Sequence, residues 1–459
     1  MEPLRSTSWI MMSLMLCTMQ PAQAAPVGNK TKVILVSMDG FRHDYLTFVN
    51  NTPNFDRMLQ EGVTMPWIRN TFTTLTFPCH FTMVTGLYEE SHGIIANNMY
   101  DEDMSPRYFG MGTTVDEWWT GHETIWTSAQ KAGLKAGVYF WVGSASKIEG
   151  VRPEKWFRYN GSIPFEERVD TLVKWMSEDD FDLGLIYFNE PDHTAHTNGP
   201  RGKKTLHEIE RMDGILGRLL DKLTETNLLD KVNLIVTSDH GMAETDSDTK
   251  LIDLRDYVNS TLVKNVVQQG ALAHLIPQPG KTQDLVDALK DVEHMRVLVK
   301  EDNTPERLHY KDHSRIQPVV LLADEGWTIS ENGTWRRLNM VRFLGDHGYD
   351  NILNSMRPIF VARGPAFKQN AVVESIDTVD IYPLMCHLLN IEPAPNNGSL
   401  QRAATLLRVP PRTPQPINSP TTPQPINCLS DWSTRPEVCS YLLGALFLLN
   451  RLIKYSIVL

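Results

Sequence analysis

The chain has 459 residues, of which 41% are hydrophobic and 22% are charged, a balance typical of a globular protein with a sizeable core. Its formal net charge of −11 argues against a protein that coats nucleic acid, because such proteins are normally basic. The charge does not exclude a pocket for a phosphate group, because bound metal ions can supply positive charge locally.

The first 24 residues have the three parts of a secretory signal peptide. Arg5 gives a charged start, residues 9–19 form an apolar run, and Ala22-Gln23-Ala24 is a small-x-small cleavage site. A buried first helix is the alternative interpretation of the apolar run. We expect a protein of the secretory pathway, at the cell surface or secreted. Six Asn-x-Ser/Thr triplets fit glycosylation after export, although such triplets also arise by chance: Asn29, Asn50, Asn160, Asn259, Asn332 and Asn397.

Strands and helices alternate along the chain. Apolar runs predict strands at 33–38, 63–69, 135–141, 183–188 and 234–237. Helices are expected at 55–60, 165–177 and 204–224. A further helix is expected to begin at Thr76, with its free N–H groups facing an anion. This alternation predicts an α/β fold: a doubly wound, mostly parallel sheet with helices on both faces.

The C-terminal part of the chain changes character after the main domain. Residues 409–427 are Pro-rich and contain the segment Thr-Pro-Gln-Pro-Ile-Asn twice, which predicts an extended linker. The tail at 428–459 has an apolar stretch at 441–449, shorter than the roughly 20 residues that a spanning helix needs. A short membrane anchor, a removable lipid-anchor signal and a free tail all stay open. Cys428 and Cys439 are candidates for a disulfide, whereas Cys79 is expected to be a buried thiol.

Three predicted strands end at or near an aspartate: Asp39, Asp192 and Asp239. A single aspartate after a strand is usually a turn or helix-capping residue. In open α/β sheets, however, the active site lies beyond the carboxyl ends of the strands. Three carboxylates that are delivered to the same edge therefore indicate a functional cluster.

Histidines extend this pattern. Asp192 and His196 are four residues apart and would share one face of a helical turn. His240 follows Asp239 directly, and His347 lies between Gly345 and Gly348. A lone histidine is more often a structural residue than a ligand. Together, however, Asp and His are the ligands typical of a catalytic zinc site, and the absence of Cys from the set disfavours a purely structural one.

The stretch from 73 to 97 carries the candidate nucleophile. It begins with three threonines, including Thr76, and ends at Asn97. A threonine hydroxyl is a poor nucleophile unless a base or a metal lowers its pKa. The Asp and His residues described above would supply that metal.

These segments together resemble the ecto-nucleotide pyrophosphatase/phosphodiesterase family, within the alkaline phosphatase superfamily. The resemblance extends in order over residues 31–405, which we take as the catalytic domain. It is carried by Val36-Ser-Met-Asp39-Gly-Phe-Arg42, Thr76-Phe-Pro-Cys-His80, Thr85-Gly-Leu-Tyr88, Ser91-His-Gly-Ile-Ile-Ala-Asn97, Glu190-Pro-Asp192 with His196, Thr237-Ser-Asp-His-Gly-Met242 and Gly345-Asp-His-Gly348.

The resemblance implies an alkaline-phosphatase-like fold and two zinc ions per chain. One zinc would be held by Asp192, His196 and His347. The other would be held by Asp39, Asp239, His240 and the nucleophile Thr76. Such a pair clamps the attacking and leaving oxygens of an in-line displacement. Thr76 would attack phosphorus to form a phosphothreonine that water then hydrolyses. Asn97 and the backbone N–H of Thr76 or Phe77 would hold a nonbridging oxygen.

The substrate is the open part of this interpretation. Phe77, Trp141 and Tyr159 match positions that form an aromatic slot for a nucleobase in the nucleotide-hydrolysing members. Cys79 instead resembles the alkaline sphingomyelinase branch, which cleaves choline phospholipids. Four further segments resemble the small membrane-bound members that cleave diadenosine polyphosphates: Leu87-Tyr-Glu-Glu-Ser-His92, Ser314-Arg-Ile-Gln-Pro318, Asp324-Glu-Gly-Trp327 and Pro395-Asn-Asn-Gly-Ser399.

We therefore expect an extracellular phosphodiesterase or pyrophosphatase that acts on small nucleotides, with a choline-phospholipid phosphodiesterase as the main alternative. A phosphomonoesterase would share the metal site. A protein of another class, an inactive binding ectodomain, would be expected to lack at least one ligand or the nucleophile. We expect no nucleic-acid-binding surface, and any association with a membrane would be through the tail at 428–459.

Overall fold

The computed structural model of the chain describes residues 31–331 and 342–411. The chain divides into a compact unit, Met1–Pro410, and a second unit, Pro411–Leu459. The expected signal peptide, nearly all of the Pro-rich linker and the C-terminal tail lie outside the described residues and stay predictions. Within the described ranges, no helix combines the length and apolar character that crossing a membrane requires.

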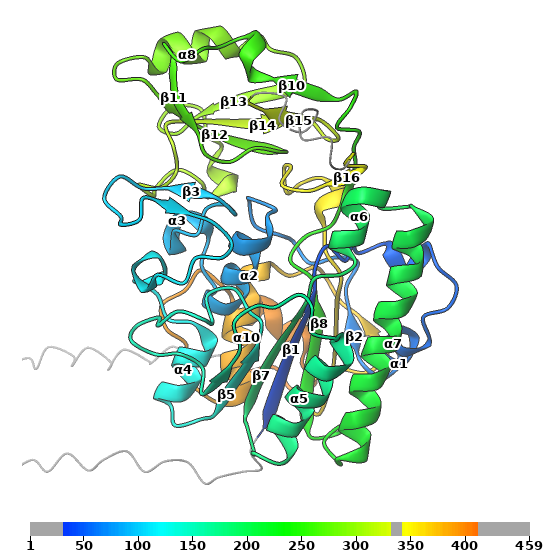
Figure 1. The fold of residues 1–459 in the computed structure, drawn as a ribbon. Helices are drawn as coiled ribbons and strands as arrows, with labels where there is room; N and C mark the ends of the chain where they lie inside the picture. The colour runs from blue at the N-terminus through cyan, green and yellow to red at the C-terminus, as the bar shows by residue number, and fades with distance from the viewer. Residues whose placement is uncertain (1–30, 332–341, 412–459) are drawn as a thin grey trace, which may run out of the picture. The chain divides into compact units, whose positions relative to one another are not determined.

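The centre of the fold is an eight-stranded sheet with the order β18-β2-β17-β8-β1-β7-β5-β6 (Figure 1). Its middle strand, β1, pairs in parallel with β7 on one side and β8 on the other. Only β17 runs antiparallel to its neighbours, β8 and β2. The predicted mostly parallel sheet is confirmed. Its strands are β1 (Lys32–Met38), β2 (Val63–Thr64), β5 (Ala136–Tyr139), β6 (Lys155–Trp156), β7 (Leu183–Phe188), β8 (Val232–Thr237), β17 (Phe360–Arg363) and β18 (Ala371–Val372).

Helices cover both faces of this sheet, as expected for a doubly wound fold. Ile34 and Val36 of β1 point into a core with one set of helices, whereas Val33 and Leu35 point into a core with the other. Because both faces are buried, β1 is apolar almost throughout. The first set is α1 (Pro53–Glu61), α5 (Phe165–Ser177) and α7 (Lys203–Glu225). The second set is α2 (Thr76–Thr85), α4 (Ile125–Lys131) and α10 (Ile381–Leu389).

The predicted boundaries hold for most elements and fail for one strand. Helix α5 begins and ends where its apolar spacing predicts, and α2 begins at Thr76. The strand expected at 63–69 is shorter, because β2 ends at Thr64. Pro66 explains the difference, since its ring nitrogen has no hydrogen to donate to a neighbouring strand.

A second, four-stranded antiparallel sheet was not predicted. Its order is β11-β12-β14-β13, and Figure 1 shows it with α8 in the upper part of the view. Leu272, Val320 and Leu322 from its inner strands belong to the same buried cluster as Val33 and Leu35 of β1. Its elements are β11 (Val263–Val266), β12 (Leu272–Pro277), α8 (Thr282–Leu289), β13 (Met295–Val299) and β14 (Val319–Ala323).

The remaining α-helices and strands of the described residues are short. They are α3 (Glu89–His92), β3 (Met99–Tyr100), β4 (Tyr108–Phe109), α6 (Asp192–Asn198), β9 (Ala243–Glu244), β10 (Leu251–Asp253), β15 (Thr328–Ser330), β16 (Gly345–Asp346) and α11 (Leu400–Ala403). The pairing of β9 with β16 brings the segment before His347 close to the segment after His240.

Candidate active site

Three aspartates meet beyond the carboxyl ends of β1, β7 and β8. Asp39 follows β1 directly, Asp192 begins α6 after β7, and Asp239 lies two residues after β8. Backbone hydrogen bonds hold them together. The Asp192 N–H donates to the Asp39 carbonyl at 3.0 Å, and the Gly40 N–H donates to Asp239 Oδ1 at 3.1 Å. The parallel register of the three strands therefore produces the carboxylate cluster.

One group of candidate ligands consists of Asp192, His196 and His347. The Nε2 atom of His196 lies 3.4 Å from Asp192 Oδ2, and Nε2 of His347 lies 3.6 Å from Asp192 Oδ1. Asp192 and His196 share a face of α6, so the four-residue spacing works as expected. One ligand atom from each of the three residues lies within 4.8 Å of the others, so they can hold a metal ion together.

A second group surrounds His240. Its Nε2 atom lies 3.4 Å from Asp39 Oδ1, 3.1 Å from Asp239 Oδ2 and 3.4 Å from Thr76 Oγ1. Asp192 also lies within the metal-binding range of Asp39 and His240. Asp192 thus lies between the two groups, and the sets expected from the resemblance are neighbours in space.

The three imidazoles make the same kind of hydrogen bond. The Nδ1 atoms of His196, His240 and His347 lie 2.8–2.9 Å from the backbone carbonyls of Gly345, Gly241 and Thr74, respectively. A carbonyl can only accept, so each Nδ1 carries a hydrogen and each neutral ring has its lone pair on Nε2. This outer contact is typical of metal-binding histidines, because it fixes the tautomer and the ring plane.

The electrostatics of the cluster fit a bound cation. Within the described residues, Asp39 Oδ1, Asp192 Oδ1 and Asp239 Oδ2 are buried without a hydrogen-bond partner. Burial, followed by the charges of Asp239 and Asp192, raises the pKa of Asp39 well above its usual range. Buried carboxylates this close together are costly unless positive charge compensates them. Carboxylate and imidazole donors without thiolate suit zinc at a catalytic site.

The histidines differ in their readiness to bind a metal. Burial, followed by the nearby His240, lowers the pKa of His347 to about 3, so its Nε2 lone pair is free at neutral pH. Burial alone would also lower the pKa of His196, but its contact with Asp192 outweighs burial and raises the pKa to about 9. A metal ion that binds there has to displace a proton from His196.

Thr76 and Asn97 face the same cavity as the ligands. Thr76 is the first residue of α2, where the backbone N–H groups have no partner within the helix. Thr76 or Phe77 was expected to offer its backbone N–H to a substrate oxygen. The Phe77 N–H instead donates to Asn97 Oδ1 at 2.9 Å, which leaves Thr76 as the expected backbone donor. That contact orients the Asn97 amide and makes its NH₂ group the donor for a ligand.

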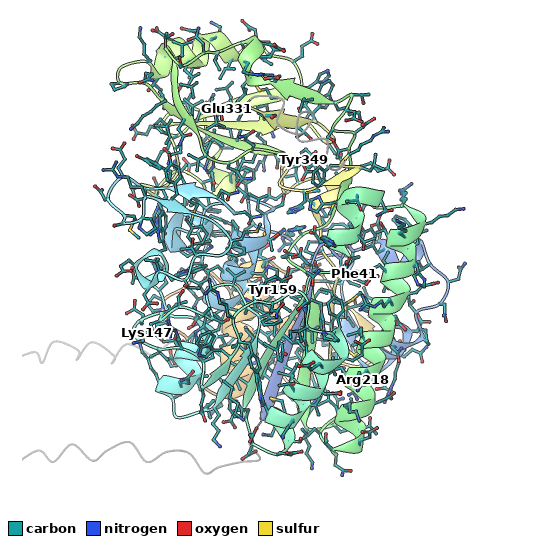
Figure 2. The ribbon with its side chains drawn as sticks, in the orientation of Figure 1. Phe41, Lys147, Tyr159, Arg218, Glu331 and Tyr349 are labelled. Carbon is teal, nitrogen blue, oxygen red and sulfur yellow. The ribbon has the colours of Figure 1, made fainter. Side chains whose placement is uncertain are left out.

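The cavity has a volume of about 630 Å³. Tyr159 is 54% exposed and lies near the centre of Figure 2. Phe77 packs against Phe109 and Trp119. Trp141 is only 5% exposed, and its indole N–H donates to the carbonyl of His80. The expected residues that line the cavity are Asp39, Thr76, Phe77, Asn97, Trp141, Tyr159, Asp192, His196 and His347.

Asp239 and His240 are fully buried and are not among the residues that line the cavity. Of the two, His240 is close to a residue that lines the cavity, because its Nε2 atom lies 3.4 Å from Thr76 Oγ1. Cys79 is also buried, as expected, with its thiol 3.2 Å from the Thr73 carbonyl.

Two polar residues beside the cluster were missed. The Tyr187 hydroxyl donates to Asp39 Oδ2 at 2.6 Å, and the His80 Nδ1–H donates to the Thr76 carbonyl at 2.8 Å. His80 Nε2 lies 2.9 Å from the Ser37 hydroxyl. Ser37 and Tyr187 are paired across β1 and β7. Ser37 and Tyr187 each place a hydroxyl near the end of an otherwise apolar strand, and this feature of the sequence could have indicated their role.

Comparisons with known proteins show the family of the chain. Residues 33–350 match the family model described as type I phosphodiesterase / nucleotide pyrophosphatase. The chain is 40% identical to a bis(5'-adenosyl)-triphosphatase of Xenopus laevis over 390 residues, 83% of each protein. It is 39% identical to the human ectonucleotide pyrophosphatase/phosphodiesterase family member 5 over 400 residues, 85% of this chain and 82% of that one.

A solved structure of a related protein is similar to this chain over the whole length of the related protein. Murine ectonucleotide pyrophosphatase/phosphodiesterase 5, as an inactive threonine-to-alanine variant in complex with AMP, has a TM-score of 0.78 and 39% identity. The similarity covers 82% of this chain and all of the murine chain. The chain therefore belongs to the type I phosphodiesterase / nucleotide pyrophosphatase family and is a hydrolase of phosphodiester or pyrophosphate bonds.

Proposed function

We propose that the protein is a two-zinc enzyme of the extracellular space that cleaves phosphodiester or pyrophosphate bonds of small nucleotides through a covalent intermediate on Thr76. The observation that carries the proposal is the position of Thr76 Oγ1. It lies 3.4 Å from His240 Nε2, in a cavity that also contains Asn97 and the carboxylates with unpartnered oxygens.

The two groups of ligands have separate roles in this proposal. Asp192, His196 and His347 would hold one zinc. Asp39, Asp239, His240 and Thr76 would hold the other. Zinc ions bound there would act as Lewis acids and would balance the charge of the carboxylates, the Thr76 alkoxide and the incoming phosphate.

The chain's own residues define the reaction. Thr76 Oγ1 forms a bond to phosphorus while the bond to the leaving oxygen breaks on the opposite side. For a diester, the intermediate is a nucleotidyl group on Thr76, which water then releases as the nucleoside monophosphate. The Asn97 NH₂ group donates to a nonbridging oxygen of the transferred phosphoryl group, where negative charge develops.

The aromatic residues favour a nucleotide. Tyr159 presents its ring to the cavity, and Phe77 lines the same space. Stacking of a base on such rings contributes about 1–3 kcal/mol per base in nucleic-acid proteins. A related protein is named a bis(5'-adenosyl)-triphosphatase, and a solved relative contains AMP, so diadenosine polyphosphates are included in the proposed substrate class. An aromatic cage would also suit choline, which is why a choline phospholipid is the competing substrate.

Export and glycosylation belong to the same proposal. The sequon asparagines that fall in the described residues, Asn50, Asn160, Asn259 and Asn397, are all exposed. Exposure is what attachment of a glycan requires. Mass spectrometry of the protein secreted by cells in culture tests both the cleavage after residue 24 and the glycans.

The function is tested by comparing substrates on one purified preparation. The proposal expects hydrolysis of diadenosine triphosphate and of the 4-nitrophenyl ester of AMP, loss of both activities after thorough chelation, and recovery with zinc at two ions per chain. Sphingomyelin in bile-salt micelles and 4-nitrophenyl phosphate serve as the alternatives. Faster cleavage of sphingomyelin or of the monoester than of any nucleotide diester would overturn the substrate assignment. Full activity without metal would overturn the zinc assignment.

A further inference from the structure

Arg168 is a fully buried arginine in the first turn of α5. Among the described residues, no carboxylate lies within salt-bridge distance of its guanidinium, and burial lowers its pKa. Buried arginines are rare and are usually paired with an acidic residue. A cation buried without such a pair requires another reason for its position.

The first contacts of Arg168 are with two backbone carbonyls. Nε and Nη2 donate to the Ile163 carbonyl at 3.2 and 3.0 Å, and Nη1 donates to the Tyr187 carbonyl at 3.1 Å. Ile163 lies near the end of the loop 157–164, which carries Tyr159 between β6 and α5. Tyr187 lies on β7, and its hydroxyl donates to Asp39. The guanidinium thus ties the loop of Tyr159 to the strand that supports the carboxylate cluster.

The second set of contacts runs from the guanidinium through the Phe140 ring to the Tyr159 ring at the cavity. The guanidinium carbon lies 5.1 Å from the centre of the Phe140 ring, and the Phe140 ring lies 5.3 Å from the Tyr159 ring. Phe140 has a φ of 60°, a left-handed conformation that costs energy for a residue with a side chain. In this conformation the Phe140 ring contacts both Arg168 and Tyr159. Both rings line the cavity, whereas Arg168 does not.

We propose that Arg168 is a positioning residue for substrate specificity: it holds loop 157–164 and, through Phe140, sets the ring of Tyr159 for stacking on the base of a nucleotide substrate. The inference rests on the proposed nucleotide function for its kinetic consequence. The loop is the part that depends on Arg168, because two of the three donated hydrogen bonds end at Ile163. The Tyr187 carbonyl belongs to a central strand that its neighbours β1 and β5 also hold.

The test compares two esters with the same leaving group: the 4-nitrophenyl ester of AMP, which fills the slot, and methyl 4-nitrophenyl phosphate, which does not. For Arg168→Met we expect KM for the AMP ester to rise about tenfold, with kcat and the methyl ester changed by less than about twofold. Arg168→Lys keeps the charge but cannot hold two carbonyls in one fork, so it should restore KM only in part.

A double-mutant cycle separates positioning from a general effect on the fold. If Arg168 acts through Tyr159, then Arg168→Met should have little further effect on KM in a Tyr159→Ala background. Arg211→Met is the matched control. The Arg211 guanidinium lies 4.6 Å from the centre of the Phe165 ring, which Arg168 also contacts at 4.5 Å, but Arg211 pairs with Glu208 at the surface. We expect this control to leave both esters unchanged.

Hydrogen–deuterium exchange gives a readout that does not depend on the substrate. Faster exchange confined to residues 157–164 in Arg168→Met supports the proposal that Arg168 holds the loop. This holds even if the wild-type enzyme shows no preference for the AMP ester. Such a lack of preference would reject only the proposed nucleotide function. Unchanged exchange in the loop overturns the proposal. So do additive effects of Arg168→Met and Tyr159→Ala, an equal loss with both esters, or failure of both Arg168 variants to fold.

Discussion

At the scale of single residues, Asp39 shows how the proposed metal site depends on neighbours that are not ligands. Its Oδ2 accepts the Tyr187 hydroxyl, which leaves Oδ1 directed at His240. Hydrogen bonds to ligating groups commonly change metal affinity or activity by about 10- to 100-fold when they are removed. Tyr187 therefore belongs to the functional site although it touches no metal in the proposed arrangement.

Replacing Tyr187 with Phe removes this donor and keeps the ring. We expect kcat/KM or zinc affinity to fall by roughly 10- to 100-fold, because the Asp39 carboxylate loses the group that orients it. Metal titration followed by activity measures both quantities. Tyr139→Phe on the neighbouring strand β5 is the control, since the Tyr139 ring stacks on Trp175 rather than beside the cluster. Equal effects of the two variants would contradict a specific role for Tyr187.

Thr76 allows a sharper substitution test. Thr76→Ala should abolish turnover while metal content and folding stay near those of the wild type. Thr76→Ser should retain part of the activity, since a hydroxyl remains at the same position on α2. Single-turnover kinetics with the AMP ester measure the chemical step directly. Near-normal kcat in Thr76→Ala would instead favour direct attack by water.

At the scale of elements, the parallel sheet and its helices could be predicted because the strands are short apolar runs and the helices have apolar residues at helical spacing. Strand β1 is apolar on both faces, and α5 buries Val169, Leu172, Val173 and Met176 at helical spacing. The delivery of Asp39, Asp192 and Asp239 to one edge followed from that prediction. The contact between the Phe77 N–H and Asn97 could not be predicted, because it depends on how a loop folds back on α2.

The four-stranded sheet was within reach of sequence analysis but was not found. Strands β12 and β14 are short apolar runs, LAHLIP and VVLLA, of the kind that predicts buried strands. Their antiparallel pairing joins segments that a helix and a third strand separate in the sequence. His274 lies in the middle of β12 and gives this sheet a property that can be measured.

The tautomer and the protonation state of His274 follow from its contacts and its burial. The Tyr310 hydroxyl donates its one hydrogen to the Ile95 carbonyl at 2.6 Å, so His274 Nε2–H must donate to the Tyr310 oxygen at 2.9 Å. The Nδ1 atom is buried without a partner among the described residues. Burial lowers the pKa of His274 from 6.5 to about 3. The ring is therefore neutral in the folded protein at physiological pH.

This shift makes stability depend on pH. Below pH 6.5 the unfolded chain gains a proton on His274 that the folded protein takes up only near pH 3, so stability is lost as the pH falls through this window. The loss from His274 between pH 7 and pH 5 amounts to about 2 kcal/mol. Denaturant unfolding at both pH values should show that His274→Gln loses less stability than the wild type. The control, His207→Gln, replaces an exposed histidine on α7 and should behave as the wild type does. An equal pH effect in all three proteins would contradict this assignment.

At the scale of the whole molecule, every proposed ligand and the nucleophile lie in the compact unit that ends at Pro410. A chain truncated after Pro410 should therefore keep kcat/KM within about twofold of the secreted full-length protein, because it retains all of these residues. Measuring kcat/KM of the truncated and the full-length proteins in parallel checks this prediction. Loss of activity on truncation would mean that residues after 410 contribute to the site or to its folding.

The central proposal is the covalent step on Thr76, and the stereochemical course at phosphorus tests it most directly. The substrate is a nucleotide phosphorothioate ester of known configuration, hydrolysed in isotopically labelled water, with the configuration of the product determined by NMR. Two successive in-line displacements, first by Thr76 and then by water, predict net retention. Net inversion would show a single displacement by water and would contradict a covalent intermediate on Thr76.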